Sequence, residues 1–203
     1  MKKKLAIIGG SGLYNFEELK EKKVIPVQKG PFGENSGEII HGILEGVEIY
    51  FLPRHGKNHS YNPSNVPYRA NIDSLKRLGC MDIISVSAVG SLKEELNPGK
   101  FVLVDQFIDR TFLRKKTFFD KNIVAHVSLA EPTCKLTTNL VYDAAIKANI
   151  DIKKGGTYLA MEGPQFSTLA ESRLYQSWGC EVIGMTNMPE AKLAREAEMR
   201  YVS

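Results

Sequence analysis

The sequence is poor in cysteine and contains no long apolar run. Its three cysteines, Cys80, Cys134 and Cys180, are odd in number and widely spaced, and no C-x-x-C pattern occurs. We therefore expect reduced thiols in a cytoplasmic protein, with neither a disulfide framework nor a zinc site. No stretch approaches the roughly 18 to 20 apolar residues of a membrane span. The apolar run at 5–8 is also too short for a signal peptide, so we expect no membrane partner.

Several motifs of common enzyme classes are also missing. The net charge of +4 is small and gives no reason to expect a nucleic-acid partner. A dinucleotide-binding G-x-G-x-x-G starting at Gly10 would need glycine where Asn15 stands. No G-K-[ST] of a P-loop follows, and the serine after Gly10 lacks the outer glycine spacing of a serine hydrolase. His55 and His59 are four residues apart, but the glycine and asparagines around them predict a loop, so we expect no metal site.

What the sequence does contain is an alternation of short apolar runs with helical patterns. The expected strands are 5–8, 38–44, 47–52, 81–86, 101–107, 157–161 and 181–185. The expected helices are 69–78, 136–149, 169–178 and 189–199. This alternation favours a single α/β domain over residues 1–203, with a mixed central β-sheet flanked by helices.

Small, hydroxyl and charged side chains follow several of these strands. They are Ser11 after 5–8, Arg54 and His55 after 47–52, Ser87 after 81–86, and Thr186 after 181–185. Ligands of an open α/β sheet gather at the carboxyl ends of its strands. Arginine suits phosphate oxygens, and glycine lets backbone N–H groups approach an anion closely. Together these residues predict an anion cradle without a metal ion, although each loop alone is also explained as a simple turn.

Two further strand ends carry groups that suit a sugar or a base. The loop at 161–167 contains a carboxylate, Glu162, and an aromatic ring, Phe166, while Met185 ends the strand at 181–185. A methionine and a phenylalanine can enclose a ribose or a base between them. Taken singly, each is better explained as filling of the core.

Seven ordered motifs resemble the methylthioadenosine phosphorylase and purine nucleoside phosphorylase family. They are residues 7–13, 53–56, 68–72, 88–92, 105–111, 161–168 and 185–190, and the similarity covers essentially the whole chain. The resemblance implies a mixed sheet flanked by helices, no cofactor, and usually a homotrimer. It implies a pentosyltransferase of purine salvage, in which phosphate as co-substrate cleaves a purine nucleoside. Residues 167–172 look closest to the methylthioadenosine branch, whose products are adenine and 5-methylthioribose 1-phosphate.

The resemblance also implies roles for individual residues. Phosphate would be held by Ser11, Arg54, His55, Ser87, the backbone of Ala88, and Thr186. The nucleoside would contact Met185 at the ribose, Phe166 at the base, His59 at the 5′ group, Ser167 and Ile183, with His126 reaching into a neighbouring subunit's pocket. Ser87 stands where family members often have threonine, and the hydroxyl is kept. A phosphate dianion under the sugar would stabilise the positive charge that develops as the base departs.

The end of the chain departs from the family pattern. Residues 200–203 look like a strand beginning after a helix, and we expect a missing C-terminal strand and helix through truncation rather than a naturally short terminus. The resemblance places a base-contacting aspartate beyond Ser203, so we assign no catalytic residue and expect little or no turnover. A 6-oxopurine or methylthioinosine phosphorylase and an inactive nucleoside- or phosphate-binding remnant are alternatives. A nucleosidase that uses water is a third, against which Arg54 and His55 count, because water needs no dianion cradle.

Overall fold

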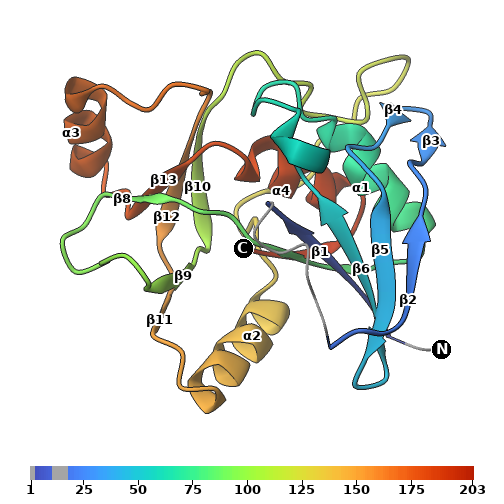
Figure 1. Ribbon diagram of the computed structural model, residues 1–203. Helices are drawn as coiled ribbons and strands as arrows, with labels where there is room; N and C mark the ends of the chain where they lie inside the picture. The colour runs from blue at the N-terminus through green and yellow to red at the C-terminus, as the bar shows by residue number, and fades with distance from the viewer. Residues whose placement is uncertain (1–2, 11–17) are drawn as a thin grey trace.

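A buried strand near the N-terminus forms the middle of a six-stranded sheet. In the computed structural model, which describes residues 3–10 and 18–203, β1 (Lys4–Gly9) pairs in parallel with β6 (Val47–Pro53) and β7 (Asp82–Ser85) (Figure 1). Ala6 and Ile8 of β1 point to one face and are fully buried. The order β14-β7-β1-β6-β5-β2 is completed by β14 (Arg200–Val202), β5 (Ile39–Leu44) and β2 (Lys20–Ile25). β14 is parallel to β7, whereas β5 and β2 run antiparallel to their neighbours.

A second sheet of four strands lies beside the first (Figure 1). In order, its strands are β10 (Gln106–Arg110), β12 (Thr157–Met161), β13 (Val182–Gly184) and β8 (Gly90–Ser91). The first three are parallel and β8 is antiparallel. Two small pairs are β9 (Phe101–Leu103) with β11 (Ile152–Lys154), and β3 (Lys29–Gly30) with β4 (Gly33–Glu34).

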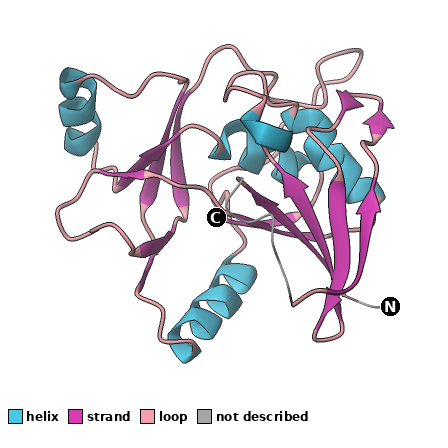
Figure 2. Ribbon diagram, viewed as in Figure 1, coloured by secondary structure: helices cyan, strands magenta, loops and turns pink. Residues whose placement is uncertain are grey.

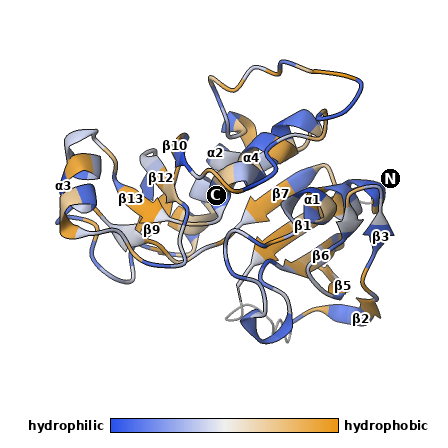
Figure 3. Cartoon of the chain, turned by 90° about the horizontal axis from the view of Figure 1, so that it is seen from above, coloured by the Kyte–Doolittle hydropathy of each residue, from blue (hydrophilic) through white to orange (hydrophobic). Residues whose placement is uncertain are grey.

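Helices cover both sheets. Those in the described part of the chain are α1 (Tyr68–Arg77), α2 (Lys135–Lys147), α3 (Leu169–Ser177) and α4 (Asn187–Glu196). α1 and α4 contact each other, whereas α2 and α3 lie on the outside of the molecule (Figure 2). The main core joins Ile83 of β7, Tyr158 of β12 and Leu193 of α4, so one apolar interior connects the two sheets. Seen from above, apolar residues concentrate along β1, β7 and β13 (Figure 3).

The fold class expected from the sequence is confirmed, with the strands divided between two mixed sheets. The predicted pair at 38–44 and 47–52 corresponds to β5 and β6, joined by Glu45 and Gly46, which both have positive φ. All four expected helices are present, with ends shifted by up to three residues. The strand expected at 200–203 is β14. The assignment of residues 1–203 to one phosphorylase domain stays a prediction.

The prediction of one strand over 101–107 is wrong. β9 and β10 are separate strands with different partners. Between them the Val104 N–H donates to the Ser203 carbonyl at 3.0 Å and the Asp105 N–H to the Gly156 carbonyl at 3.1 Å, so the chain changes partner there. β2 was not predicted because its sequence is mostly charged; it is an exposed edge strand, where charge opposes unwanted pairing.

Residues 3–10 and 18–203 contain no helix of the length and apolarity needed to cross a membrane. In the same residues, histidine, cysteine and carboxylate side chains form no group of three or more suited to a metal ion. Cys80, Cys134 and Cys180 are free thiols. Burial raises the pKa of Cys80 to about 12, so this thiol stays protonated at neutral pH.

Candidate functional site

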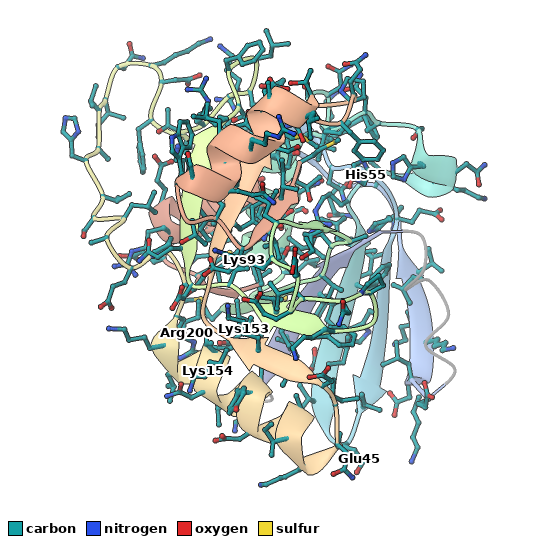
Figure 4. All side chains as sticks on the ribbon, turned by 90° about the vertical axis from the view of Figure 1, so that its left-hand side faces the viewer. Glu45, His55, Lys93, Lys153, Lys154 and Arg200 are labelled. Carbon is teal, nitrogen blue, oxygen red and sulfur yellow. The ribbon has the colours of Figure 1, made fainter. Side chains whose placement is uncertain are left out.

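A cavity of about 810 Å³ opens where strands of both sheets end. Its volume is in the range of small-molecule sites. Its lining follows the carboxyl ends of β1, β6, β7, β12 and β13, which is where α/β sheets hold ligands. In Figure 4, His55 lies at this end of β6, opposite the turn at Glu45. The lining residues are Gly10, Arg54, His55, His59, Pro63, 86–90, Met161, Phe166, Ser167 and 183–186.

The cavity brings together all but two of the residues to which the family resemblance assigns a ligand contact, whereas Glu162 lines a neighbouring cavity instead. Ser11 lies outside the described residues. His126 is exposed in the loop between β10 and α2 and does not line the cavity of its own chain. The role expected for it in a neighbouring subunit stays a prediction, as do the ligand contacts of the other residues.

Arg54 is a buried guanidinium beside the cavity, with only 1% of the residue exposed. Its Nε and Nη2 donate to the two carboxylate oxygens of Glu190 at 2.8 and 3.1 Å. Nη2 also donates to Ser85 Oγ at 2.7 Å and to the Ile8 carbonyl at 3.3 Å. Nη1 donates to the Val86 carbonyl at 3.0 Å. Among the residues that the structure describes, Nη1 has this one acceptor, and because a guanidinium has five N–H donors, its second N–H can serve a ligand.

Glu190 is the centre of this buried network. Besides Arg54, it accepts hydrogen bonds from Ser85 Oγ at 2.5 Å and from the Tyr201 hydroxyl at 2.9 Å. Burial alone would lower the pKa of Arg54, but the Glu190 carboxylate outweighs burial and raises it. Burial also raises the pKa of Tyr201 well above its ordinary value, so its hydroxyl stays a donor. Since the pair compensates its own charge, Arg54 acts as a fixed N–H donor more than as a free positive charge.

His55 is a second polar group of the lining, held by the loop that follows β6. η2 (Lys57–His59) places His59 against it, with ring centroids 4.1 Å apart and planes 15° from parallel. His55 Nδ1 lies 2.8 Å from the Tyr61 carbonyl, so Nδ1 carries the proton of the neutral ring and Nε2 is an acceptor. Burial lowers the pKa of His55, against the opposing effect of the Tyr61 hydrogen bond. We therefore expect a neutral His55 near pH 7 until an anion binds.

The ends of β7 and β13 supply hydroxyl and main-chain groups. Ser87 Oγ donates to Asn187 Oδ1 at 3.2 Å, which ties the β7 loop to the start of α4. The Thr186 N–H donates to the Tyr158 hydroxyl at 3.3 Å. A Cβ on Gly184 would lie 2.0 Å from that hydroxyl oxygen, so glycine is required for Tyr158 to reach this loop.

Apolar side chains form the rest of the lining. Ile183 and Met185 belong to the second core cluster or pack against it. Phe166 is 86% exposed and lies between this cavity and a neighbouring one of about 520 Å³. Ser167 Oγ lies 2.8 Å from Ser172 Oγ. An exposed aromatic ring at the cavity edge is suited to stacking on a planar ligand.

Most of the buried residues that hydrogen-bond to the lining residues were not predicted from the sequence. Glu190 was recognised as part of a motif, but its contact with Arg54 was not predicted. A second buried ion pair joins Arg114 Nε to Glu162 Oε1 at 3.2 Å, and the Arg114 side chain is 0% exposed. Glu162 follows an apolar strand, which was a usable signal. Arg114 precedes two lysines in a loop, which offers none.

Comparisons with known proteins agree with this geometry. The family model of the Phosphorylase superfamily matches residues 4–203. The S-methyl-5′-thioadenosine phosphorylase of Cereibacter sphaeroides is 59% identical over 203 residues, which are 100% of this chain and 70% of that protein.

Solved structures match over essentially the whole chain as well. A methylthioadenosine phosphorylase sourced from an antarctic soil metagenomic library has a TM-score of 0.94 and 50% identity, covering 99% of this chain and 71% of that one. Methylthioadenosine phosphorylase from Schistosoma mansoni in complex with adenine has a TM-score of 0.94 and 38% identity, covering 100% of this chain and 80% of that one. The family indicated by the seven motifs is confirmed, and the chain belongs to the Phosphorylase superfamily.

Proposed function

We propose that this cavity binds inorganic phosphate and a purine nucleoside for phosphorolysis of 5′-methylthioadenosine. The products would be adenine and 5-methylthioribose 1-phosphate, as in purine and methionine salvage. The names of the relatives support the substrate. The Schistosoma mansoni relative was solved with adenine and with tubercidin, which supports a purine in the cavity.

The observation that carries the proposal is the mixture of groups in one cavity. Arg54, His55, Ser87 and Thr186 come from three strand ends, and Phe166, Ile183 and Met185 add apolar surface. One N–H of Arg54, the Thr186 hydroxyl and the backbone at Ala88 would donate to phosphate oxygens, and the Ser87 hydroxyl would do so by turning away from Asn187 Oδ1. Because Glu190 already compensates Arg54, the dianion would be held by directed hydrogen bonds more than by net charge.

In the proposed reaction the main task of the protein is to place the phosphate next to the anomeric carbon of the sugar. As the bond between sugar and base breaks, its electron pair leaves with the base, which must take up a proton to become neutral adenine. The sugar gains positive charge, and a dianion fixed beneath it stabilises that charge. The same dianion then forms the new bond to the anomeric carbon, because it is already held within reach. Met185 would contact the ribose, Phe166 the base and His59 the 5′ group, with Ser167 and Ile183 as further contacts to the nucleoside. No cofactor takes part in this scheme.

The proposal extends to assembly and location. Phe112, Leu113, Phe166 and Leu169 are each more than two-thirds exposed, and exposed apolar residues of this size favour a contact between copies. This supports an association of copies; that the assembly is the expected homotrimer, with His126 serving a neighbouring cavity, is part of the proposal. Sedimentation analysis would test the trimer, and a monomer at all concentrations would contradict it. We also propose a cytoplasmic location and a single domain over 1–203.

The decisive experiment combines a product assay with binding. Purified chain is incubated with methylthioadenosine and phosphate, and adenine release is followed by chromatography. Inosine, guanosine and methylthioinosine serve as alternative substrates, and a reaction without phosphate tests the nucleosidase. Calorimetry with phosphate and adenine covers the case of binding without product, which would identify a non-catalytic binding protein. Absence of both binding and product would refute the proposal.

A matched pair of serine variants tests the anion contacts. Ser87→Ala removes a hydroxyl from the cavity, and loss of a hydrogen bond to a charged group should weaken phosphate binding about tenfold or more. Ser177→Ala is the control, because its hydroxyl donates to the Leu174 carbonyl on the exposed side of α3. Equal phosphate affinities in the two variants would remove Ser87 from the proposed site.

A further inference from the structure

Arg114 lies in the loop that connects β10 to α2, and this loop crosses toward α1 before it returns (Figure 1). Its side chain is 0% exposed. The guanidinium donates to four backbone carbonyls: Met185 and Met188 from Nη1, and Met161 and Glu162 from Nη2. Two of these residues, Met161 and Met185, line the cavity. One side chain therefore joins the ends of the neighbouring strands β12 and β13.

Glu162 compensates the charge of Arg114 and fixes its loop. Its carboxylate accepts Arg114 Nε at 3.2 Å, the backbone N–H groups of Phe112 and Leu113, and the Ser64 hydroxyl. Burial would raise the pKa of Glu162, but these donors lower it, led by Ser64. The carboxylate is thus ionised at neutral pH, and the Arg114 loop is held at both its backbone and its side chain.

A third segment of the lining depends on the same guanidinium. Arg114 Nη1 donates to the Tyr68 hydroxyl at 3.1 Å, and that hydroxyl donates to the Pro63 carbonyl at 2.8 Å. Pro63 lines the cavity. The guanidinium carbon also lies 5.4 Å from the centroid of the Tyr68 ring, within the range of a cation–π contact.

The Met185 side chain is fixed by the same loop. Gly163, with φ of +69°, directly follows Glu162, and a Cβ there would lie 2.5 Å from Met185 Sδ. Met185 therefore packs on the bare backbone of the turn, while Arg114 holds its carbonyl. Both its backbone and its side chain are set by groups that Arg114 and Glu162 organise.

We propose that Arg114, with Glu162, is a positioning residue for the nucleoside part of the cavity; this rests on the proposed function. Arg114 donates to the carbonyls of Met161 and Met185 in the lining and to that of Met188 at the start of α4, but among the described residues it forms no hydrogen bond with Arg54, His55 or Ser87. The phosphate groups have their own support, in which Glu190 holds Arg54 and Tyr158 holds the Thr186 N–H. Loss of Arg114 should therefore weaken the binding of the nucleoside much more than the binding of phosphate.

The test compares Arg114→Met with wild type in ligand binding and in side-chain order. Methylthioadenosine and adenine affinities, measured by calorimetry, should fall about 10- to 100-fold, which corresponds to about 1.4 to 2.8 kcal/mol of binding free energy. Phosphate affinity should change far less. Arg114→Lys, which keeps the charge but cannot donate to four carbonyls, should lie between the two. It also provides the test should Arg114→Met fail to fold.

Methyl-¹³C methionine spectra give a readout that needs no ligand. The signals of Met185 and Met161 should shift or broaden in the variants, while Met81 and Met199 should not. Equal loss of phosphate and nucleoside affinity, or an unchanged Met185 signal in a folded variant, would overturn the proposal. Wild-type protein that binds neither adenine nor methylthioadenosine would instead refute the proposed function, while the spectra would still decide whether Arg114 orders Met185.

Discussion

Replacing Glu190 by glutamine should destabilise the whole fold, because it removes a buried charge that four donors share. Arg54 Nε and Nη2, Ser85 Oγ and the Tyr201 hydroxyl all donate to this carboxylate. Both side chains of the ion pair are 1% exposed. Glutamine has nearly the same volume, so the change leaves packing intact and presents an amide NH₂ to groups that are themselves donors.

The magnitude follows from the burial of the pair. Breaking a buried ion pair by removing one partner costs about 3 to 5 kcal/mol, because the other charge is left without compensation. For a chain of this size, 1 kcal/mol corresponds to about 2 to 4 °C in Tm, so the expected drop is roughly 6 to 20 °C. Removing both charges, in Arg54→Met with Glu190→Leu, should cost much less than the sum of the single changes.

Thermal and urea unfolding followed by circular dichroism provide the measurement. The matched control is Glu94→Gln, an exposed glutamate in the loop after β8, which should change the free energy of unfolding by no more than about 0.5 kcal/mol. If Glu190→Gln behaves like this control, or if the double replacement is as damaging as both single ones together, the reasoning about the buried pair is refuted.

Two further predictions concern pH. Burial lowers the pKa of His55, so the ring must gain a proton before it can donate to an anion from Nε2. The affinity for sulfate, whose own charge is constant in this range, should therefore rise as the pH falls from about 8 toward 5.5. His55→Gln should abolish this trend in calorimetric titrations, and an unchanged trend would exclude His55 as its source. Burial would raise the pKa of Asp109, but hydrogen bonds led by Lys192 lower it from 3.8 to about 2. Its stabilising effect should therefore be complete above pH 3.8 and disappear as the pH approaches 2. At pH 7, Asp109→Asn should cost about 1 to 2 kcal/mol after allowance for solvent screening, a difference that unfolding curves at pH 2 should no longer show; a pH-independent difference would contradict the assignment.

Local patterns in the sequence were sufficient for most of the fold. The run at 5–8 and the helix at 69–78 have one buried face each, and hydrophobic spacing reports such faces directly. The division of 101–107 into β9 and β10 could not be predicted, because it depends on Ser203 and Gly156, which are distant in sequence. Edge strand β2 has no buried face of its own and therefore no hydrophobic signal.

The residues of the site also fall into a group that the sequence predicts and a group that depends on the tertiary fold. Residues that line the cavity follow strands, so the rule that ligands bind at carboxyl ends identifies Arg54, His55 and Thr186. The buried residues that hydrogen-bond to the lining reach it only through the tertiary fold. Arg114 and Glu162 are 48 positions apart, and no spacing rule connects a loop arginine to carbonyls at the ends of two strands. A buried charged side chain can be recognised only when the residues that pack around it in the fold are known.

The pairing of Arg54 with Glu190 also bears on synthesis of the chain. The two residues are 136 positions apart, so at about 5 to 20 residues per second the ribosome releases the glutamate roughly 7 to 27 s after the arginine. During that interval the Glu190 carboxylate is missing, so burial of the guanidinium would leave its charge uncompensated. Any nascent chain that stops before α4 should therefore stay open at this edge and be exposed to proteases, however well β1, β5 and β6 have already paired.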